Sequence, residues 1–196
     1  MNRRNVNIMP MAGEGKRFKK AGYKTPKPLI DINGEPMFIK SAKCMPDADL
    51  WIFIMQKKYL ENDIVVREIN NNFKKYKIIT VDQVTKGQAN SCILAKKYLE
   101  KDDQIFISAC DNFIEFDIEA YNKKSKEYDV LVFTTQCNKT HQQNPKSYGW
   151  IKKNNAGVLD VSCKKPFSSN PVNDRIIIGT FAFKGLDFFI KSIDSL

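Results

Sequence analysis

The first 32 residues hold a glycine-rich turn followed by clustered cations. An apolar run, Ile8 to Ala12, ends at Gly13-Glu14-Gly15, and four basic residues follow at positions 16, 17, 19 and 20. Glycine has no Cβ, so its backbone N–H groups can come close to phosphate oxygens. Cations offset the charge of phosphates that leave water. With Pro26-Lys27-Pro28 before a second apolar run, this spacing predicts a polyphosphate site.

Two other glycine motifs do not fit this turn. The dinucleotide fingerprint needs a third glycine where the chain has Phe18, and the P-loop needs Gly-Lys followed by Ser or Thr after four intervening residues. The remaining alternative is a surface turn that happens to hold two glycines and four cations.

Further polar candidates follow other apolar runs. Asp111 comes just after the run Gln104 to Ala109, where a carboxylate could hold Mg²⁺ or could instead cap the following turn. Gln83 follows Tyr76 to Val81, and its amide offers both a donor and an acceptor to a base edge. The alternative for the Gln83 segment is a polar turn before a helix.

Alternating strands and helices must position these residues. Such alternation predicts an α/β fold with right-handed βαβ units and a mostly parallel sheet, in which ligands bind beyond the carboxyl ends of the strands. We expect strands at Ile8 to Ala12, Leu29 to Ile32, Leu50 to Met55, Tyr76 to Val81, Gln104 to Ala109 and Val130 to Thr135, and helices at Met37 to Cys44, Tyr59 to Phe73, Gly87 to Leu99 and Ile118 to Lys126.

The pattern changes after about Gln136. A polar loop, His141 to Ser147, precedes an expected hairpin of Tyr148 to Ile151 and Val158 to Ser162 with its turn at Asn154 to Gly157. A strand from Ile176 to Phe183 and a helix from Leu186 to Ile193 would follow. We therefore expect one domain over 1–196, with a mostly parallel half at about 1–135 and an antiparallel half at about 136–196.

Composition narrows the class of protein. The net charge of +10 permits acidic partners, but the basic residues are spread along the chain without repeated aromatics, which argues against a specific nucleic-acid binder. No apolar run is long enough to span a bilayer, and no signal peptide is evident. Five scattered cysteines and one histidine, His141, offer no metal-ligand spacing, so a cytoplasmic protein with reduced thiols is expected.

The two front motifs resemble the signature of the nucleotidyltransferase family that makes nucleotide sugars and related compounds. That signature is A-G-x-G-x-R-F followed by P-K-P-L, which matches residues 12–18 and 26–29, although Lys16 stands where relatives often have a small hydroxyl residue. The resemblance implies a Rossmann-like sheet, Arg17 and Lys27 as catalytic cations, and Mg²⁺ on Asp111. It implies nucleotide contacts from Met11, Ala12, Gly13, Glu14, Gly15, Lys16, Gln83, Gly87, Gln88 and Ala89.

The resemblance implies a nucleotide-binding half at about 1–135 and an acceptor-binding half at about 136–196. The later half resembles the family's acceptor site less closely. Lys164 replaces a glutamate that binds sugar hydroxyls in relatives, which argues against an ordinary hexose acceptor. Relatives also supply a second metal-binding aspartate late in the chain, and neither Asp187 nor Asp194 sits in a matching motif, so the acceptor half could be truncated. The acceptor residues implied by the resemblance are Asn112, Tyr148, Gly149, Lys165, Gly179 and Thr180.

The activity implied is transfer of a nucleotidyl group from an NTP to a phosphorylated small molecule, with release of pyrophosphate. The short length and Lys164 favour CTP with a non-sugar acceptor such as phosphoglutamine, in cell-surface (capsule) polysaccharide synthesis. A sugar 1-phosphate with UTP or dTTP is the second expectation. A non-catalytic nucleotide-binding module is the alternative from another class.

Overall fold

The computed structural model describes residues 3–61, 63–154 and 157–194, and the chain forms two compact units. Unit 1 comprises residues 1–131 and 181–196, and unit 2 comprises residues 132–180. Two strands run through the boundaries of these units, β7 (Val130–Gln136) and β10 (Arg175–Lys184). The chain therefore returns to unit 1 after unit 2 instead of ending in it.

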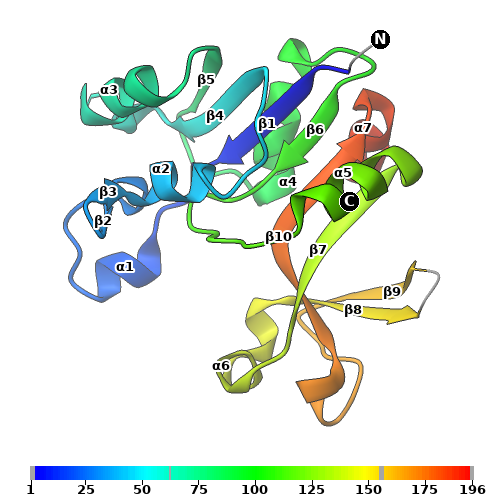
Figure 1. Ribbon diagram of the computed structural model, residues 1–196. Coiled ribbons are helices and arrows are strands. Elements are labelled where there is room, and N and C mark those ends of the chain that lie inside the picture. The colour runs from blue at the N-terminus through cyan, green and yellow to red at the C-terminus, as the bar shows by residue number, and fades with distance from the viewer. Residues whose placement is uncertain (1–2, 62, 155–156, 195–196) are drawn as a thin grey trace. The chain divides into compact units, whose positions relative to one another are not determined.

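The core of unit 1 is a parallel sheet, as the alternation of strands and helices predicts (Figure 1). Its strands run in the order β5, β4, β1, β6, and the last part of β10 pairs antiparallel with β6, where Phe181 lies opposite Ile107. Strand β1 pairs with a parallel neighbour on each edge, and helices cover both faces of the sheet, so Val6, Ile8 and Met9 have no exposed surface. The bounds are Tyr76–Val81 for β5, Leu50–Gln56 for β4, Asn5–Pro10 for β1 and Gln104–Ile107 for β6.

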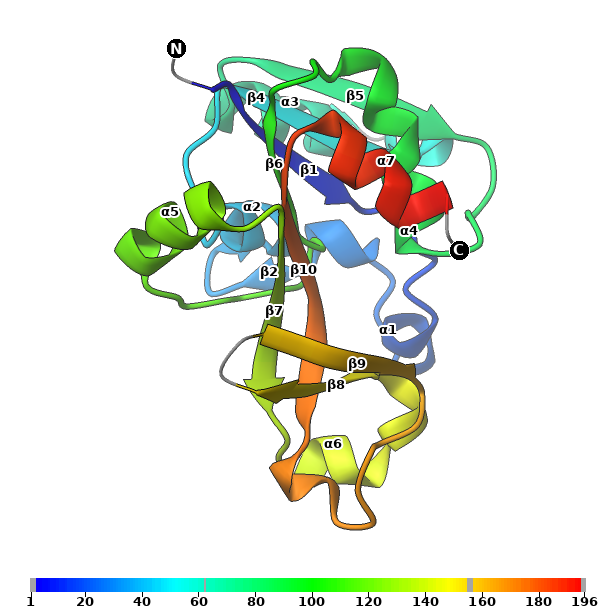
Figure 2. The ribbon, with the colours of Figure 1, turned by 90° about the vertical axis from the view of Figure 1, so that its right-hand side faces the viewer.

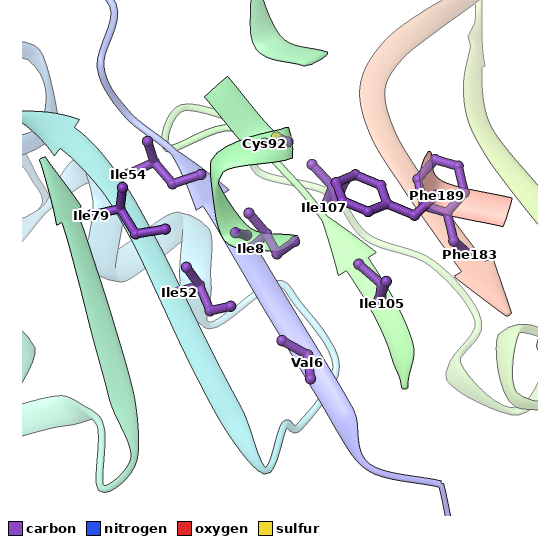
Figure 3. Packing of buried hydrophobic residues seen from close by; sticks show 11 residues of the cluster. Val6, Ile8, Ile52, Ile54, Ile79, Cys92, Ile105, Ile107, Phe183 and Phe189 are labelled. Carbon is purple, nitrogen blue, oxygen red and sulfur yellow. The ribbon is translucent and has the colours of Figure 1, made fainter. Parts of the chain in front are cut away.

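Helices cover both faces of this sheet, because successive side chains of each strand point to opposite faces. Val6 and Ile8 pack with Cys92 and Phe189 on the face covered by α4 and α7 (Figures 2 and 3). The opposite face meets α2 and α5 through ring contacts such as Phe38 against Phe53. The bounds are Met37–Ala42 for α2, Asp63–Asn72 for α3, Gln88–Cys92 for α4, Ile118–Glu127 for α5 and Leu186–Asp194 for α7.

Three predicted elements of unit 1 differ in detail. The segment Gly87 to Leu99 is α4 followed by a 3₁₀ helix, Ile93–Tyr98. Tyr59 belongs to a 3₁₀ turn, Lys57–Tyr59, ahead of α3. The expected strand Leu29 to Ile32 is wrong at its start: Lys27–Leu29 is a 3₁₀ turn in which the Leu29 N–H donates to the Pro26 carbonyl, and only Asp31–Ile32 (β2) pairs with Glu35–Pro36 (β3).

Unit 2 contains β7, β8, β9 and the first part of β10, around a core of Trp150, Ile176 and Cys137. The expected hairpin is confirmed as β8 (Gly149–Asn154) and β9 (Gly157–Cys163), while residues 155–156 of its turn lie outside the described residues. The expected loop His141 to Ser147 is wrong, because α6 (Lys139–Gln143) and a 3₁₀ turn, Pro145–Ser147, form there. A further 3₁₀ turn, Pro171–Asn173, lies later in unit 2. Asn138 makes α6 possible by accepting a hydrogen bond from the His141 N–H.

Along the described parts of the chain, no helix has the length and apolar character needed to cross a bilayer.

One short helix in unit 1 was not expected from the sequence. Residues 16–20, predicted as turn and loop, form α1 (Lys16–Lys20), which begins directly after the glycine turn.

Candidate functional site

A hollow of about 290 Å³ opens at the carboxyl ends of β1 and β6 in unit 1. We call it the strand-end hollow. Its position is the one at which parallel α/β sheets bind ligands. It is lined by Pro10, Met11, Ala12, Gly13, Gly15, Lys27, Pro28, Val84, Thr85, Gly87, Gln88, Ser91, Ala109, Cys110 and Asp111.

Two side chains hydrogen-bond to the backbone of the glycine turn, one from β4 and one from the 3₁₀ turn Lys57–Tyr59 that follows β4. Gln56 Nε2 donates to the Ala12 carbonyl at 2.6 Å, and the Tyr59 hydroxyl donates to the Gly13 carbonyl at 3.4 Å. A Cβ at Gly13 would meet no heavy atom within 4 Å, so the space beside this residue is open. Gly15 has φ 62°, in the left-handed region that glycine adopts most readily. The turn is therefore held in place while one side stays accessible to a ligand.

Lys27 and Asp111 form an ion pair in the strand-end hollow, with 2.5 Å between Nζ and Oδ2. Only 20% of the lysine side chain and 31% of the aspartate side chain is exposed. Gly15 lies against this pair, because a Cβ added there would be 3.0 Å from Lys27 Cβ. The position of the glycine turn and the position of Lys27 are therefore linked.

The Ser41 side chain also supports the turn that carries Asp111. Ser41 Oγ lies 2.8 Å from the carbonyl oxygens of both Ala109 and Asn112, which flank Asp111, and its hydroxyl donates there. Cys110 is buried, and burial raises the pKa of its thiol to about 12, with the Asp111 carboxylate adding to the rise and the Lys27 ammonium opposing it. The thiol therefore stays protonated at neutral pH and is no nucleophile. Nothing in the sequence pattern pointed to Ser41.

A second wall of the hollow consists of hydroxyl and amide groups before and within α4. Thr85 Oγ1 donates to the Gly87 carbonyl at 3.0 Å and lies 2.6 Å from Ser91 Oγ. Gln88 lines the same wall, whereas Gln83 is exposed and is not among the lining residues. Sequence reasoning pointed to the segment that forms this wall but missed Thr85 and Ser91, which no periodicity distinguishes from other turn and helix residues.

The structure brings together some of the expected catalytic, metal-binding and nucleotide-binding residues and leaves others outside the hollow. Arg17 is exposed on α1, and Lys16 forms an ion pair of 3.2 Å with Glu14. Those that line the hollow are Met11, Ala12, Gly13, Gly15, Lys27, Gly87, Gln88 and Asp111, and those that do not are Glu14, Lys16, Arg17, Gln83 and Ala89.

The expected acceptor residues divide between the two units. Asn112 belongs to unit 1, while Tyr148, Gly149, Lys165, Gly179 and Thr180 belong to unit 2. Within unit 2, Tyr148 makes an edge contact with the His141 ring, Thr180 is fully buried and Lys165 is exposed. Gly179 adopts a positive φ of 74° within β10, where a side chain would be strained.

The residues of the strand-end hollow fit a magnesium ion that arrives with phosphates. Mg²⁺ is commonly held by one or two carboxylates together with substrate phosphates and water. Asp111 supplies one carboxylate, and among residues 3–61, 63–154 and 157–194 no group of three or more His, Cys, Asp or Glu side chains could hold an ion. Asp187 and Asp194 lie in α7 and are not lining residues.

Curated proteins of known activity are similar to this chain in sequence. A mannose-1-phosphate guanyltransferase of Aspergillus oryzae is 24% identical over 182 residues, which cover 87% of this chain and 48% of that protein. The chain thus spans about half the length of this curated relative.

Solved structures at low identity show the same fold. A putative glucose-1-phosphate thymidylyltransferase from Bacillus anthracis superposes with a TM-score of 0.75 at 18% identity, covering 98% of this chain and 78% of that one. The inositol-1-phosphate CTP transferase from T. maritima gives a TM-score of 0.69 at 17% identity, covering 93% of this chain and 71% of that one. The family described as "Nucleotidyl transferase" matches residues 7–192, and the chain belongs to that family.

Proposed function

We propose that this protein transfers a nucleotidyl group from an NTP to a phosphorylated small molecule and releases pyrophosphate. The observation that carries the proposal is the strand-end hollow, in which an open glycine turn, the Lys27 ammonium and the Asp111 carboxylate lie together at the ends of parallel strands. Membership of the nucleotidyl transferase family supports the same reaction class.

The residues of the hollow suggest how the reaction is assisted. The acceptor phosphate is ionised at neutral pH, so attack on the α-phosphorus needs no general base, and catalysis rests on positioning and charge stabilisation. In our proposal the Gly13 to Gly15 turn binds the phosphates that leave as pyrophosphate, and Lys27 stabilises the negative charge of the transition state. Asp111 would hold Mg²⁺, which would supply positive charge to offset that of the phosphates. The exposed Lys165 would bind the acceptor phosphate.

CTP is our favoured donor, with a phosphorylated non-sugar acceptor such as phosphoglutamine in surface polysaccharide synthesis. A fold neighbour is named as an inositol-1-phosphate CTP transferase, which supports CTP and a non-hexose acceptor without deciding either. Lys164 at the position of the family's sugar-binding glutamate agrees with that choice. Since other neighbours are named as a putative glucose-1-phosphate thymidylyltransferase and a UDP-glucose pyrophosphorylase, a sugar 1-phosphate with UTP or dTTP is the second candidate.

Two measurements test the proposal. Thermal shift with each of the four NTPs and Mg²⁺ identifies the donor, because a ligand that binds only the folded state raises the melting temperature. Pyrophosphate release with that NTP and a panel of phosphorylated acceptors then identifies the reaction. Lys27→Met should lower turnover about 10²- to 10³-fold, as expected for loss of one preorganised donor, while Lys43→Met, which breaks a surface ion pair with Glu35, should not change it.

The outcomes separate two classes of protein. Nucleotide binding without pyrophosphate release for any acceptor would favour a non-catalytic nucleotide-binding module. If no NTP raises the melting temperature, the proposed function is wrong.

A further inference from the structure

The two groups of the strand-end hollow that carry opposite charge neutralise each other. Lys27 Nζ lies 2.5 Å from Asp111 Oδ2, and both side chains are largely shielded from water. Among the described residues that line the hollow, Lys27 is the only cation and Asp111 the only acid. Neither charge has an alternative partner within the lining, so removal of one leaves the other poorly compensated.

This pairing penalises the binding of either ligand alone. A divalent cation at Asp111 would compete with Lys27 for the same carboxylate, and it would place a second positive charge beside the ammonium. A phosphate at Lys27, without a cation, would lie beside the freed Asp111 carboxylate. A cation and a phosphate that enter together replace both partners at once, so neither charge of the pair is left uncompensated.

We propose that the Lys27–Asp111 pair couples divalent-cation binding to nucleotide binding through an exchange of partners. In the free protein Lys27 occupies the place of the cation; on binding, Lys27 pairs with a phosphate and Asp111 with the cation. The proposal rests on the proposed function, because it assumes that the phosphates of a nucleotide reach Lys27. Coupling of this kind is reciprocal: each ligand raises the affinity for the other by the same factor.

Packing around Lys27 supports a defined position for its ammonium rather than a chance surface contact. The Cβ of Lys27 lies against Gly15, and its Nζ lies 5.9 Å from the centre of the Phe18 ring. On the other side, Ser41 holds the carbonyl groups that flank Asp111. The glycine turn and the aspartate turn therefore both constrain the pair.

The cation arm of the test needs no nucleotide and no activity. Mn²⁺ binding to the free protein is measured from the loss of the free-ion electron paramagnetic resonance signal for wild type, Lys27→Met and Lys43→Met. We expect Lys27→Met to bind Mn²⁺ at least tenfold more tightly than wild type, since Asp111 is no longer paired. Lys43→Met removes an exposed lysine from its Glu35 pair in the same unit and should leave Mn²⁺ affinity unchanged. Lys27→Gln provides a second neutral variant should the methionine variant not fold.

The phosphate arm uses the nucleotide that thermal shift identifies, in the presence of EDTA. Asp111→Asn frees Lys27 and removes the carboxylate that would repel phosphates, so metal-free nucleotide should bind more tightly to this variant than to wild type. In wild type, adding Mn²⁺ should raise nucleotide affinity at least tenfold, and in Asp111→Asn this gain should be largely lost.

The results that overturn the proposal differ from those that overturn the proposed function. Equal Mn²⁺ affinity of wild type, Lys27→Met and Lys27→Gln would show that the pair does not oppose cation binding, and the partner exchange would be wrong. A protein that binds no nucleotide under any condition would refute the proposed function, and the Mn²⁺ comparison would still decide whether Lys27 blocks Asp111.

Discussion

Gly15→Ala should lower both the stability of the protein and the nucleotide affinity that we propose for the strand-end hollow. Gly15 adopts φ 62°, and an added Cβ would lie 3.0 Å from Lys27 Cβ, closer than such atoms normally approach. The left-handed conformation costs a non-glycine residue about 1–2 kcal/mol. The contact requires Lys27 to move as well, and Lys27 carries the ammonium that pairs with Asp111.

Two other glycines separate these effects. Gly22 has φ 89°, and a Cβ added there would meet no heavy atom within 4 Å, so Gly22→Ala measures backbone strain alone. Gly13 lies outside the left-handed region and also faces open space, so Gly13→Ala adds a methyl group to the hollow without backbone strain. For a chain of this size, a loss of 1–2 kcal/mol lowers the melting temperature by roughly 2–8 °C.

The assay is differential scanning fluorimetry of the three variants, with and without a saturating NTP and Mg²⁺. We expect Gly22→Ala to lose about 1–2 kcal/mol of stability and keep nucleotide affinity. Gly13→Ala should keep stability and lose affinity, and Gly15→Ala should lose both, with affinity falling about tenfold for a further 1.4 kcal/mol. If Gly15→Ala matched wild type in melting temperature and nucleotide affinity, the argument from backbone strain at Gly15 and from its contact with Lys27 would be refuted.

Three further predictions concern unit 1 and the thiols. Arg4 donates from Nε and a terminal nitrogen to the Asp103 carboxylate, which is 1% exposed. Arg4→Met leaves this buried carboxylate without its cation and should lower the free energy of unfolding by about 3 kcal/mol. Urea titration measures the change, and an unchanged midpoint would contradict the prediction. Burial raises the pKa of Tyr121 and of Cys110 to about 12, from ordinary values of 10.0 and 9.0. As the pH rises, the unfolded chain therefore loses these protons before the folded protein does. The free energy of unfolding should fall between about pH 9 and 12, by up to about 1.4 kcal/mol per pH unit for each group. Tyr121→Phe should flatten that fall in denaturation measured against pH. A disulfide reagent at pH 8 should label exposed Cys163 at once and Cys110 only as the protein unfolds; equal rates would refute this.

The order of elements in unit 1 could be predicted from the sequence because it depends on local patterns. Apolar runs such as Leu50 to Met55 are typical of strands covered on both faces, and the intervening amphipathic segments are typical of helices. That alternation implies a parallel sheet and places the Gly13 turn and Asp111 at its carboxyl edge, as the structure shows.

Short helices and turns were less predictable where a single side chain or hydrogen bond decides the conformation. The segment His141 to Ser147 is polar and resembles a loop, but Asn138 caps it and α6 forms. Similarly, the apolar residues from Leu29 onward suggested a strand. Pro28 and the hydrogen bond from the Leu29 N–H instead stabilise a 3₁₀ turn at Lys27–Leu29. Periodicity over three to seven residues is too short to distinguish such elements.

The sequence by itself determined the fold class, the glycine turn and the residue types available for phosphate chemistry, because backbone preference and apolar periodicity are local properties. Only the tertiary structure decided that Lys27 pairs with Asp111, that Ser41 and Tyr59 support the two turns, and that Thr85 rather than Gln83 lines the hollow. These contacts join segments far apart in the chain. Their geometry follows from how the strands align and the turns pack, which no local pattern encodes.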